Sequence, residues 1–191
     1  MDNQVAIQQK EKSRTTRLLT IIATGSIAIF FGSLCSAYLF RRQAPDWFHT
    51  TLPHFFIIST ILVILSSISL TIAQWALKVE KIKLSYYYAT GAMITGILFL
   101  FSQTFAWYQM YQNGNYFVGS YSSPSASFIF VLSFAHFCHI ISGIIVLAYI
   151  TTKLKKGGYS NSNNYGFNTG SIYWHFLTIL WIYLFLFMNY I

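Results

Sequence analysis

The sequence contains few charged residues, and this scarcity restricts the class of protein. Only 8% of its 191 residues are charged, whereas 55% are hydrophobic and 19% are aromatic. A soluble globular domain carries about 25% charged residues. A chain of this length with so few charges cannot cover itself with a polar surface, so we expect lipid to surround most of it.

Acidic residues and cysteines are also scarce, and both absences exclude kinds of chemistry. The four acids lie outside the long apolar runs and are Asp2, Glu11, Asp46 and Glu80. A proton relay or an ion-coupled transporter normally uses a carboxylate within the membrane, so this function is disfavoured. Cys35 and Cys138 both lie inside apolar runs, which argues against a disulfide framework or a zinc site.

The remaining charge is mostly basic, with 12 Lys and Arg against 4 Asp and Glu, a net charge of +8. A strongly basic chain raises the question of nucleic-acid binding. Here the basic residues cluster at the ends of apolar runs, where membrane topology requires them. We therefore expect membrane lipids as partners, and no nucleic acid.

Five apolar runs follow one another, each about 20 residues long or longer, which is enough to cross the hydrocarbon core as a helix. Because the backbone finds no water there, helices are required. The sequence predicts an all-α, polytopic membrane bundle, with a basic cytoplasmic tail at 1–17 and one five-helix domain at 18–191. The first run exceeds a signal-peptide core, so we expect no cleavable signal. The runs span about 18–40, 55–77, 86–107, 127–150 and 171–191.

The basic residues also predict the orientation. The tail, the second connection and the fourth connection carry ten Lys and Arg, whereas the first connection carries only Arg41 and Arg42 and the third carries none. By the positive-inside rule, the N-terminus is cytoplasmic and the C-terminus is outside. We expect a multi-pass protein of a bacterial inner membrane. The ten are Lys10, Lys12, Arg14, Arg17, Lys78, Lys81, Lys83, Lys153, Lys155 and Lys156.

Tryptophans and small residues indicate how the helices meet the bilayer and one another. Most tryptophans lie near the ends of runs, as interfacial aromatics do. Small residues recur along the runs and predict close helix packing, with a face for a partner. The tryptophans are Trp47, Trp75, Trp107, Trp174 and Trp181. The small residues include Gly25, Gly32, Ser33, Ser36, Ala37, Ser59, Ser66, Ser67, Ser69, Gly91, Gly96, Ser142 and Gly143.

Histidines are the only candidates for metal or haem ligation within the runs. His136 and His139 share one face of the fourth helix, and His175 lies in the first turns of the fifth. Haem ligation by His139 and His175 would need equal depths, and their predicted depths differ by roughly 5–10 Å. We interpret them as polar contacts between helices. His49 and His54 flank the first connection.

Three stretches resemble subunit III of the haem–copper oxidases, the respiratory cytochrome c and quinol oxidases. The last run reads Tyr-Trp-His-Phe at 173–176, then Trp181, Leu184 and Phe185, and Gly166-Phe167 precedes it. The fourth run holds His136-x-x-His139-x-x-x-Gly143, and the first ends Ser-Ala-Tyr-Leu-Phe-Arg, with Tyr38 and Arg41. Weaker matches are 65–67 and Gly96 to Gln103. Together they cover nearly the whole chain in order.

The resemblance implies a subunit without an active site or redox centre of its own. It would pack against oxidase subunit I, beside subunit II and a small subunit IV, and bind phospholipid. Haem and copper would lie in the partner subunits, where oxygen is reduced to water and protons are pumped. The family-motif residues would be His136, His139, Gly143, Tyr173, Trp174, His175, Phe176 and Trp181. Arg41, Arg42 and Trp47 are the candidates for contacts with lipid headgroups.

The sequence also departs from the family. Ser26, Ala106, Asn168 and Thr178 stand where the resemblance implies acidic residues, which argues against a role in proton collection. Only the later five helices of the seven-helix members are matched. Two alternatives remain: a subunit III-like accessory protein of nitric oxide reductases, and a self-sufficient membrane cytochrome that binds haem through His139 and His175.

Overall fold

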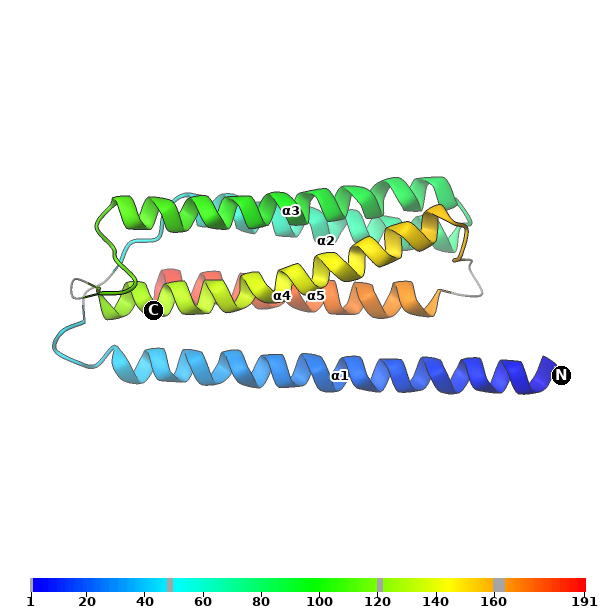
Figure 1. Cartoon of the computed structure of the whole chain (residues 1–191), viewed down its shortest axis with the longest axis horizontal. Coiled ribbons are helices and arrows are strands. Elements are labelled where there is room, and N and C mark those ends of the chain that lie inside the picture. The colour runs from blue at the N-terminus through cyan, green and yellow to red at the C-terminus, as the bar shows by residue number, and fades with distance from the viewer. Residues whose placement is uncertain (1, 48–49, 120–121, 160–163) are drawn as a thin grey trace.

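The computed structural model describes residues 2–47, 50–119, 122–159 and 164–191, and His49 therefore lies outside the described residues. The described chain forms five helices and no strand (Figure 1). All five are long and apolar enough to cross a membrane, as predicted. They are α1 (Asp2–Arg41), α2 (Phe55–Lys78), α3 (Ile82–Gln112), α4 (Pro124–Lys155) and α5 (Tyr165–Tyr190).

Most helices extend beyond the apolar runs that predicted them, although α2 begins at the predicted residue and α5 ends one residue early. α4 starts with Pro124, which needs no backbone N–H in the first turn, and the Ser123 hydroxyl accepts a hydrogen bond from the Ala126 N–H. α1 begins at Asp2, so the predicted tail at 1–17 continues the first helix. The division into a tail and one domain stays a prediction.

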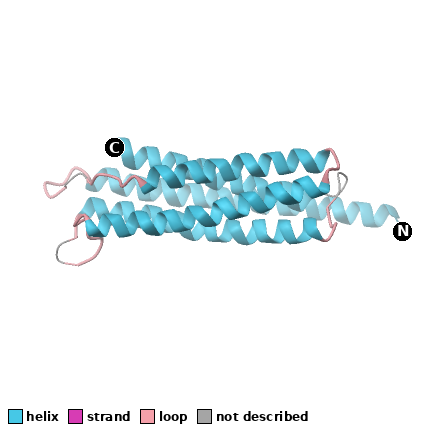
Figure 2. Ribbon diagram, turned by 90° about the horizontal axis from the view of Figure 1, so that it is seen from above, coloured by secondary structure: helices cyan, strands magenta, loops and turns pink. Residues whose placement is uncertain are grey.

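Helices α2 to α5 form a closed ring, in which each helix contacts two neighbours. Among the described residues, α1 contacts α4 and α5 but neither α2 nor α3. Figures 1 and 2 show all five helices running along one axis, with α1 beside the α4–α5 pair. The core of the ring is therefore enclosed by four helices, while most of α1 faces outward.

Serine hydroxyls join α2 to α3. Lipid is as apolar as leucine, so it does not drive apolar helices together, and close packing and hydrogen bonds must hold them instead. Four hydroxyls donate to backbone carbonyls of the facing helix at 2.7–3.1 Å. The pairs are Ser66 with Ala92, Ser69 with Tyr88, Ser85 with Ala73, and Ser102 with Phe55.

Helix α1 does not use its small residues for packing within the chain. It buries the stripe Phe31, Cys35 and Tyr38 against the ring. Gly25 and Gly32 lie on the outward face, and a Cβ added to either would meet nothing within 4 Å. Close packing of these small residues within the chain is therefore not found in α1, because its inward stripe consists of larger residues, while a face for a partner stays a prediction.

The tryptophans divide into two groups that the sequence did not separate. Trp75, near the end of α2, is 56% exposed, as expected of an interfacial residue. Trp174 and Trp181 are fully buried in the core of the ring, so the prediction that they lie at the interface is wrong. Their neighbours on α2, α3 and α4 enclose them.

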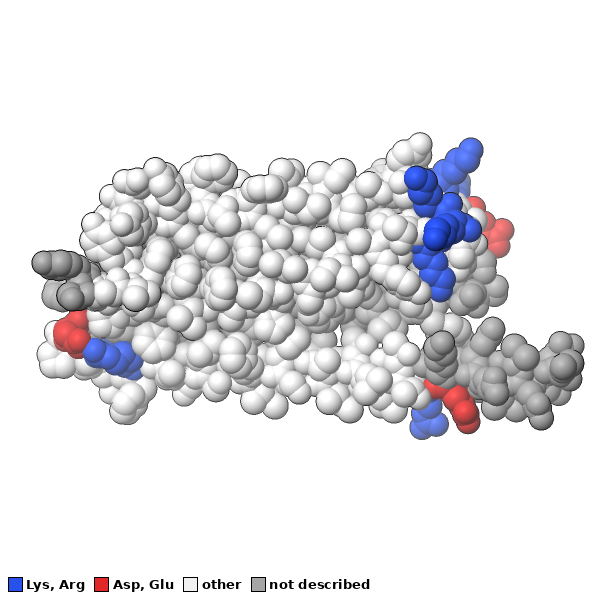
Figure 3. All heavy atoms as spheres, in the orientation of Figure 1, with Lys and Arg blue, Asp and Glu red and all other residues white. Residues whose placement is uncertain are grey.

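The charged residues gather at the two ends of the molecule (Figure 3). The lysines of the α2–α3 turn and of the α4–α5 connection lie at the end that holds the N-terminus, and Arg41, Arg42 and Asp46 lie at the other. Between them the surface is apolar, with many exposed Leu, Ile and Phe side chains. This distribution fits a membrane-spanning body, while the direction in which it spans stays a prediction.

The α2–α3 turn contains a residue in the left-handed region. Glu80 has φ of 59°, the Glu80 N–H donates to the Leu77 carbonyl, and the Lys81 N–H donates to the Ala76 carbonyl. These bonds are those of a Schellman motif, where glycine is normally found because a Cβ is unfavourable at positive φ.

We expect Glu80→Gly to raise the free energy of unfolding by about 0.5–1 kcal/mol, because glycine relieves the strain but adds freedom to the unfolded chain. Thermal unfolding in detergent, followed by circular dichroism, measures this. Glu80→Ala is the control, since it removes the carboxylate and keeps the Cβ. If both variants raised the free energy of unfolding equally, the effect would come from loss of the charge and not from relief of backbone strain.

Candidate functional site

The contact between α4 and α5 is built around the indole of Trp174. This side chain is fully buried, and it lies against two glycines on two different helices. A Cβ added to Gly96 of α3 would lie 2.7 Å from Trp174 Cη2, and one added to Gly143 of α4 would lie 2.9 Å from Trp174 Cε3. Real Cβ atoms do not come this close, so only glycine at both positions lets the ring fit.

His136 lies at the centre of the bundle and is fully buried. Its ring stacks on Trp181 at 5.0 Å between centroids, and it meets Phe99 of α3 and Phe31 of α1 edge-on at 6.0 and 6.2 Å. The Trp181 indole N–H donates to the Thr60 hydroxyl of α2 at 3.0 Å. Aromatic contacts around one imidazole thus bring all five helices together.

His139 and His175 face different helices. The His139 ring meets Phe31 of α1 at 5.5 Å, and its Nδ1 lies 2.7 Å from the Ala135 carbonyl. The His175 Nδ1 lies 2.6 Å from the Ser67 hydroxyl of α2. Because α1 and α2 share no contact in the described structure, the two imidazoles point to separate sides of the α4–α5 pair. This arrangement does not fit a haem shared between them.

The other motif residues also make contacts between helices. The Tyr173 hydroxyl of α5 lies 2.6 Å from the Ser142 hydroxyl of α4, and Phe176 packs, partly buried, against the core. Gly143, Trp174 and Tyr173 therefore lie at the α4–α5 contact, as does the His136–Trp181 pair, whereas His139 and His175 reach α1 and α2. Their functional importance stays a prediction.

Several partners of these residues carry no strong signal in the sequence. Thr60, Phe31 and Phe99 lie in other helices and contact Trp181 or His136. The Gln103 amide donates to the Ser59 hydroxyl at 2.7 Å inside the core. Of these partners, Gln103 was indicated in advance by a weak family match, as was 65–67, and Ser59 was named among the small residues that predict close packing. A polar residue in a long apolar run is the signal that identifies such contacts.

The residues predicted to meet lipid headgroups lie at the far end of α1. Arg41 forms a bidentate ion pair with Asp46, in which the two guanidinium nitrogens Nη1 and Nη2 lie 2.7 and 2.6 Å from Oδ1 and Oδ2. This pairing lowers the pKa of the Asp46 carboxyl. This contribution to stability is present above the unfolded-state pKa of Asp46 and is lost as pH falls through the lowered one. Trp47 packs edge-on against Tyr38 at 4.9 Å. Headgroup contacts by Arg41, Arg42 and Trp47 stay predictions.

Cysteine and metal chemistry find little support in the described part of the chain. Cys35 and Cys138 are both free, the former buried and the latter exposed. Nowhere in the described ranges do three or more His, Cys, Asp or Glu side chains come together as metal ligands would.

We expect Gly143→Ala and Gly96→Ala each to lower the free energy of unfolding by about 1–3 kcal/mol, because the new methyl overlaps the rigid Trp174 ring. Gly32→Ala is the matched control, since it adds the same methyl to a helix where nothing lies within 4 Å. Thermal unfolding of the three variants compares them. Equal melting temperatures for Gly143→Ala and Gly32→Ala would contradict the packing.

The His175–Ser67 contact is testable by a double-mutant cycle. We expect a coupling of about 0.6 kcal/mol between His175→Ala and Ser67→Ala, the average for hydrogen bonds between membrane helices. Additive effects of the two substitutions would show that the contact does not contribute to stability. Thr71→Ala, whose hydroxyl donates to the Ser67 carbonyl of its own helix, is the control.

Comparison with known proteins shows the family of the chain. The family model described as Cytochrome c oxidase subunit III matches residues 20–191, which include α2 to α5 and the part of α1 from residue 20 onward. One relative is 31% identical over 132 residues. It is the cytochrome bo(3) ubiquinol oxidase subunit 3 of Buchnera aphidicola subsp. Acyrthosiphon pisum. That alignment covers 69% of this chain and 63% of the relative, so less than two thirds of the relative is matched.

Two further relatives are matched over more of their length. The corresponding ubiquinol oxidase subunit 3 of Buchnera aphidicola from Baizongia pistaciae is 26% identical, and the alignment covers 85% of this chain and 84% of the relative. A probable quinol oxidase subunit 3 of Staphylococcus aureus is 27% identical, with 86% and 83% covered.

Proposed function

Because the chain belongs to the cytochrome c oxidase subunit III family, we propose that it is the non-catalytic third subunit of a respiratory haem–copper oxidase. In this role it packs against subunit I, stabilises it and binds lipid, while subunit I reduces oxygen to water and pumps protons. Subunit II and a small subunit IV complete the complex. Haem and copper belong to the partner subunits.

One observation supports a structural role above the others: the three histidines of α4 and α5 are used to join helices. His136 stacks on Trp181, His139 meets Phe31, and His175 contacts Ser67. A histidine that ligates a cofactor needs a free ring nitrogen aimed at a common point. His139 and His175 are instead directed at Phe31 of α1 and Ser67 of α2, on separate sides of the α4–α5 pair, and His136 is enclosed by aromatic rings.

The apolar body and its charged ends support a multi-pass protein of the bacterial inner membrane. The lysines gather at the N-terminal end, which favours a cytoplasmic N-terminus and an external C-terminus. At the other end, Arg42, Arg41 and Trp47 would then meet lipid headgroups of the outer leaflet. Paired arginines suit this role because guanidinium binds phosphate.

The relatives favour quinol as the electron donor of the complex. The printed names of the Buchnera and Staphylococcus proteins are quinol or ubiquinol oxidase subunits, although the family model itself is described for cytochrome c oxidase. They also favour an oxidase over a nitric oxide reductase.

The test is purification of the complex in mild detergent through a tag at the C-terminus. We expect a large subunit with haem and copper to accompany the chain, and the eluate to consume oxygen with a quinol but not with reduced cytochrome c. Nitric oxide reduction in place of oxygen consumption would favour the accessory-protein alternative.

The His139→Ala variant separates the scaffold from a self-sufficient cytochrome. A scaffold keeps the haem content of the complex, at lower thermal stability, because His139 loses its contact with Phe31. A chain that purifies alone with one haem, and loses it on His139→Ala, would overturn the proposed function. Reduced-minus-oxidised spectra measure the haem in each case.

A further inference from the structure

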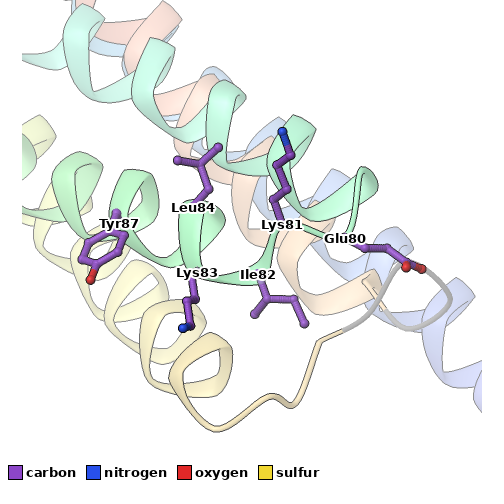
Figure 4. A pocket seen from close by; sticks show the side chains of 6 residues that line it. All are labelled: Glu80, Lys81, Ile82, Lys83, Leu84 and Tyr87. Atoms are coloured by element: carbon purple, nitrogen blue, oxygen red, sulfur yellow. The ribbon is translucent and has the colours of Figure 1, made fainter.

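A shallow hollow of about 690 Å³ lies at the turn between α2 and α3. It is at the end of the molecule that holds the N-terminus, where the spans reach the membrane surface. In Figure 4 Lys83 and Tyr87, four residues apart on α3, project on the same side of the helix. A single water occupies about 30 Å³, so the hollow has room for a much larger group. Its lining consists of Glu80, Lys81, Ile82, Lys83, Leu84 and Tyr87.

The lysines of this hollow have no acidic partner in the described structure. The single ion pair found among the described residues joins Arg41 to Asp46 at the opposite end. Lys81 and Lys83 are both exposed, and Lys78 lies one turn away at the end of α2. Lys83 also lies in the first turn of α3, where the helix dipole disfavours a positive charge. Helix formation alone therefore does not account for these charges, and a bound anion would stabilise them.

Membrane topology requires positive charge at this end, but it does not require a hollow. The other lysine-rich connection at the same end shows the difference. There the Lys153 ammonium lies 4.4 Å from the centre of the Tyr159 ring, so it makes a cation–π contact within the chain. Burial raises the pKa of Tyr159 to about 12, so this ring stays neutral. Lys81 and Lys83 instead line the hollow, and their side chains project to opposite sides of the start of α3 (Figure 4).

The rest of the lining is apolar and aromatic. Ile82 and Leu84 lie beside the lysines, and the Tyr87 side chain is 69% exposed. Tyrosine and tryptophan favour the level of the lipid headgroups, where one end of the side chain is apolar and the other is hydrated. Trp75, at 56% exposed, lies one turn before Lys78 on α2. Free phosphate would use only the lysines, whereas a lipid would also use these apolar groups.

We propose that this hollow binds an anionic phospholipid, with its phosphate between Lys83 and the Tyr87 hydroxyl and its upper acyl chains along Ile82 and Tyr87, which project on the same side (Figure 4). Lys81 adds positive charge from the other side of the start of α3. The site is separate from the headgroup contacts at Arg41 and Arg42, which lie at the opposite end. It rests on the membrane placement of the proposed function, and not on which oxidase the chain joins.

Native mass spectrometry of the full chain in detergent tests the site, with phosphatidylglycerol as the probe. We expect the double variant Lys81→Gln/Lys83→Gln to weaken the tightest phosphatidylglycerol binding about tenfold or more, since each lysine near an anionic lipid surface contributes several-fold. The matched control is Lys155→Gln/Lys156→Gln, which removes the same charge from the same end. Its binding should stay within about twofold of the parent.

Further comparisons decide the outcome. Glu80→Gln removes the one acid of the lining, so it should strengthen phosphatidylglycerol binding. A misfolded variant would not show this gain in affinity. Equal weakening by both lysine pairs, or equal binding of phosphatidylcholine, would overturn the site. Competition by glycerol 3-phosphate as strong as that by the lipid would identify a soluble anion instead. A lysine variant that still purifies with the haem-containing subunit would leave the proposed function intact whatever the lipid result.

Discussion

The placement of the Trp174 indole between α3 and α4 is the interaction on which the rest of the bundle depends. In a bilayer, helices gain little by burying apolar surface against each other, so association relies on close approach. Gly96 and Gly143 provide that approach, because neither has a Cβ that would meet the ring. Trp174 in turn fixes the position of α5 against both helices. The contacts of the neighbouring motif residues, His175 and Tyr173, follow from that position.

The polar groups of the interior serve the same purpose. The serine hydroxyls between α2 and α3, the Gln103–Ser59 pair and the Trp181–Thr60 bond all cross between helices. His136 differs, because neither of its ring nitrogens has a hydrogen-bond partner among the described residues; the Trp174 indole N–H and the Ser171 hydroxyl have none there either. The position of His136 is held by stacking and edge-on contacts with aromatic rings. Such an interior suits a scaffold, in which polar side chains specify which helices meet.

The surface differs between the middle of the bundle and its two ends. The middle is apolar and meets lipid, and most of α1 belongs to this surface. The outward face of α1 carries Gly25 and Gly32, where an added Cβ would meet none of the described residues within 4 Å. The two ends differ in charge: Arg41 is paired with Asp46 at one end, and lysines line a hollow at the other. A subunit that joins a larger complex within the membrane needs all of these surfaces.

The sequence by itself determined the number of helices, because each apolar run has the length of a membrane span and a bilayer permits only helices. It also indicated the family, since residues such as His136, Gly143 and His175 stand at spacings that resemble the family's motifs. Only the tertiary structure decided which way each residue faces. All the helices are apolar on nearly every side, so periodicity does not distinguish a face toward lipid from a face toward protein. For this reason Trp174 and Trp181 were expected at the interface but are buried. For the same reason the glycines of α1 were expected in contacts but face outward.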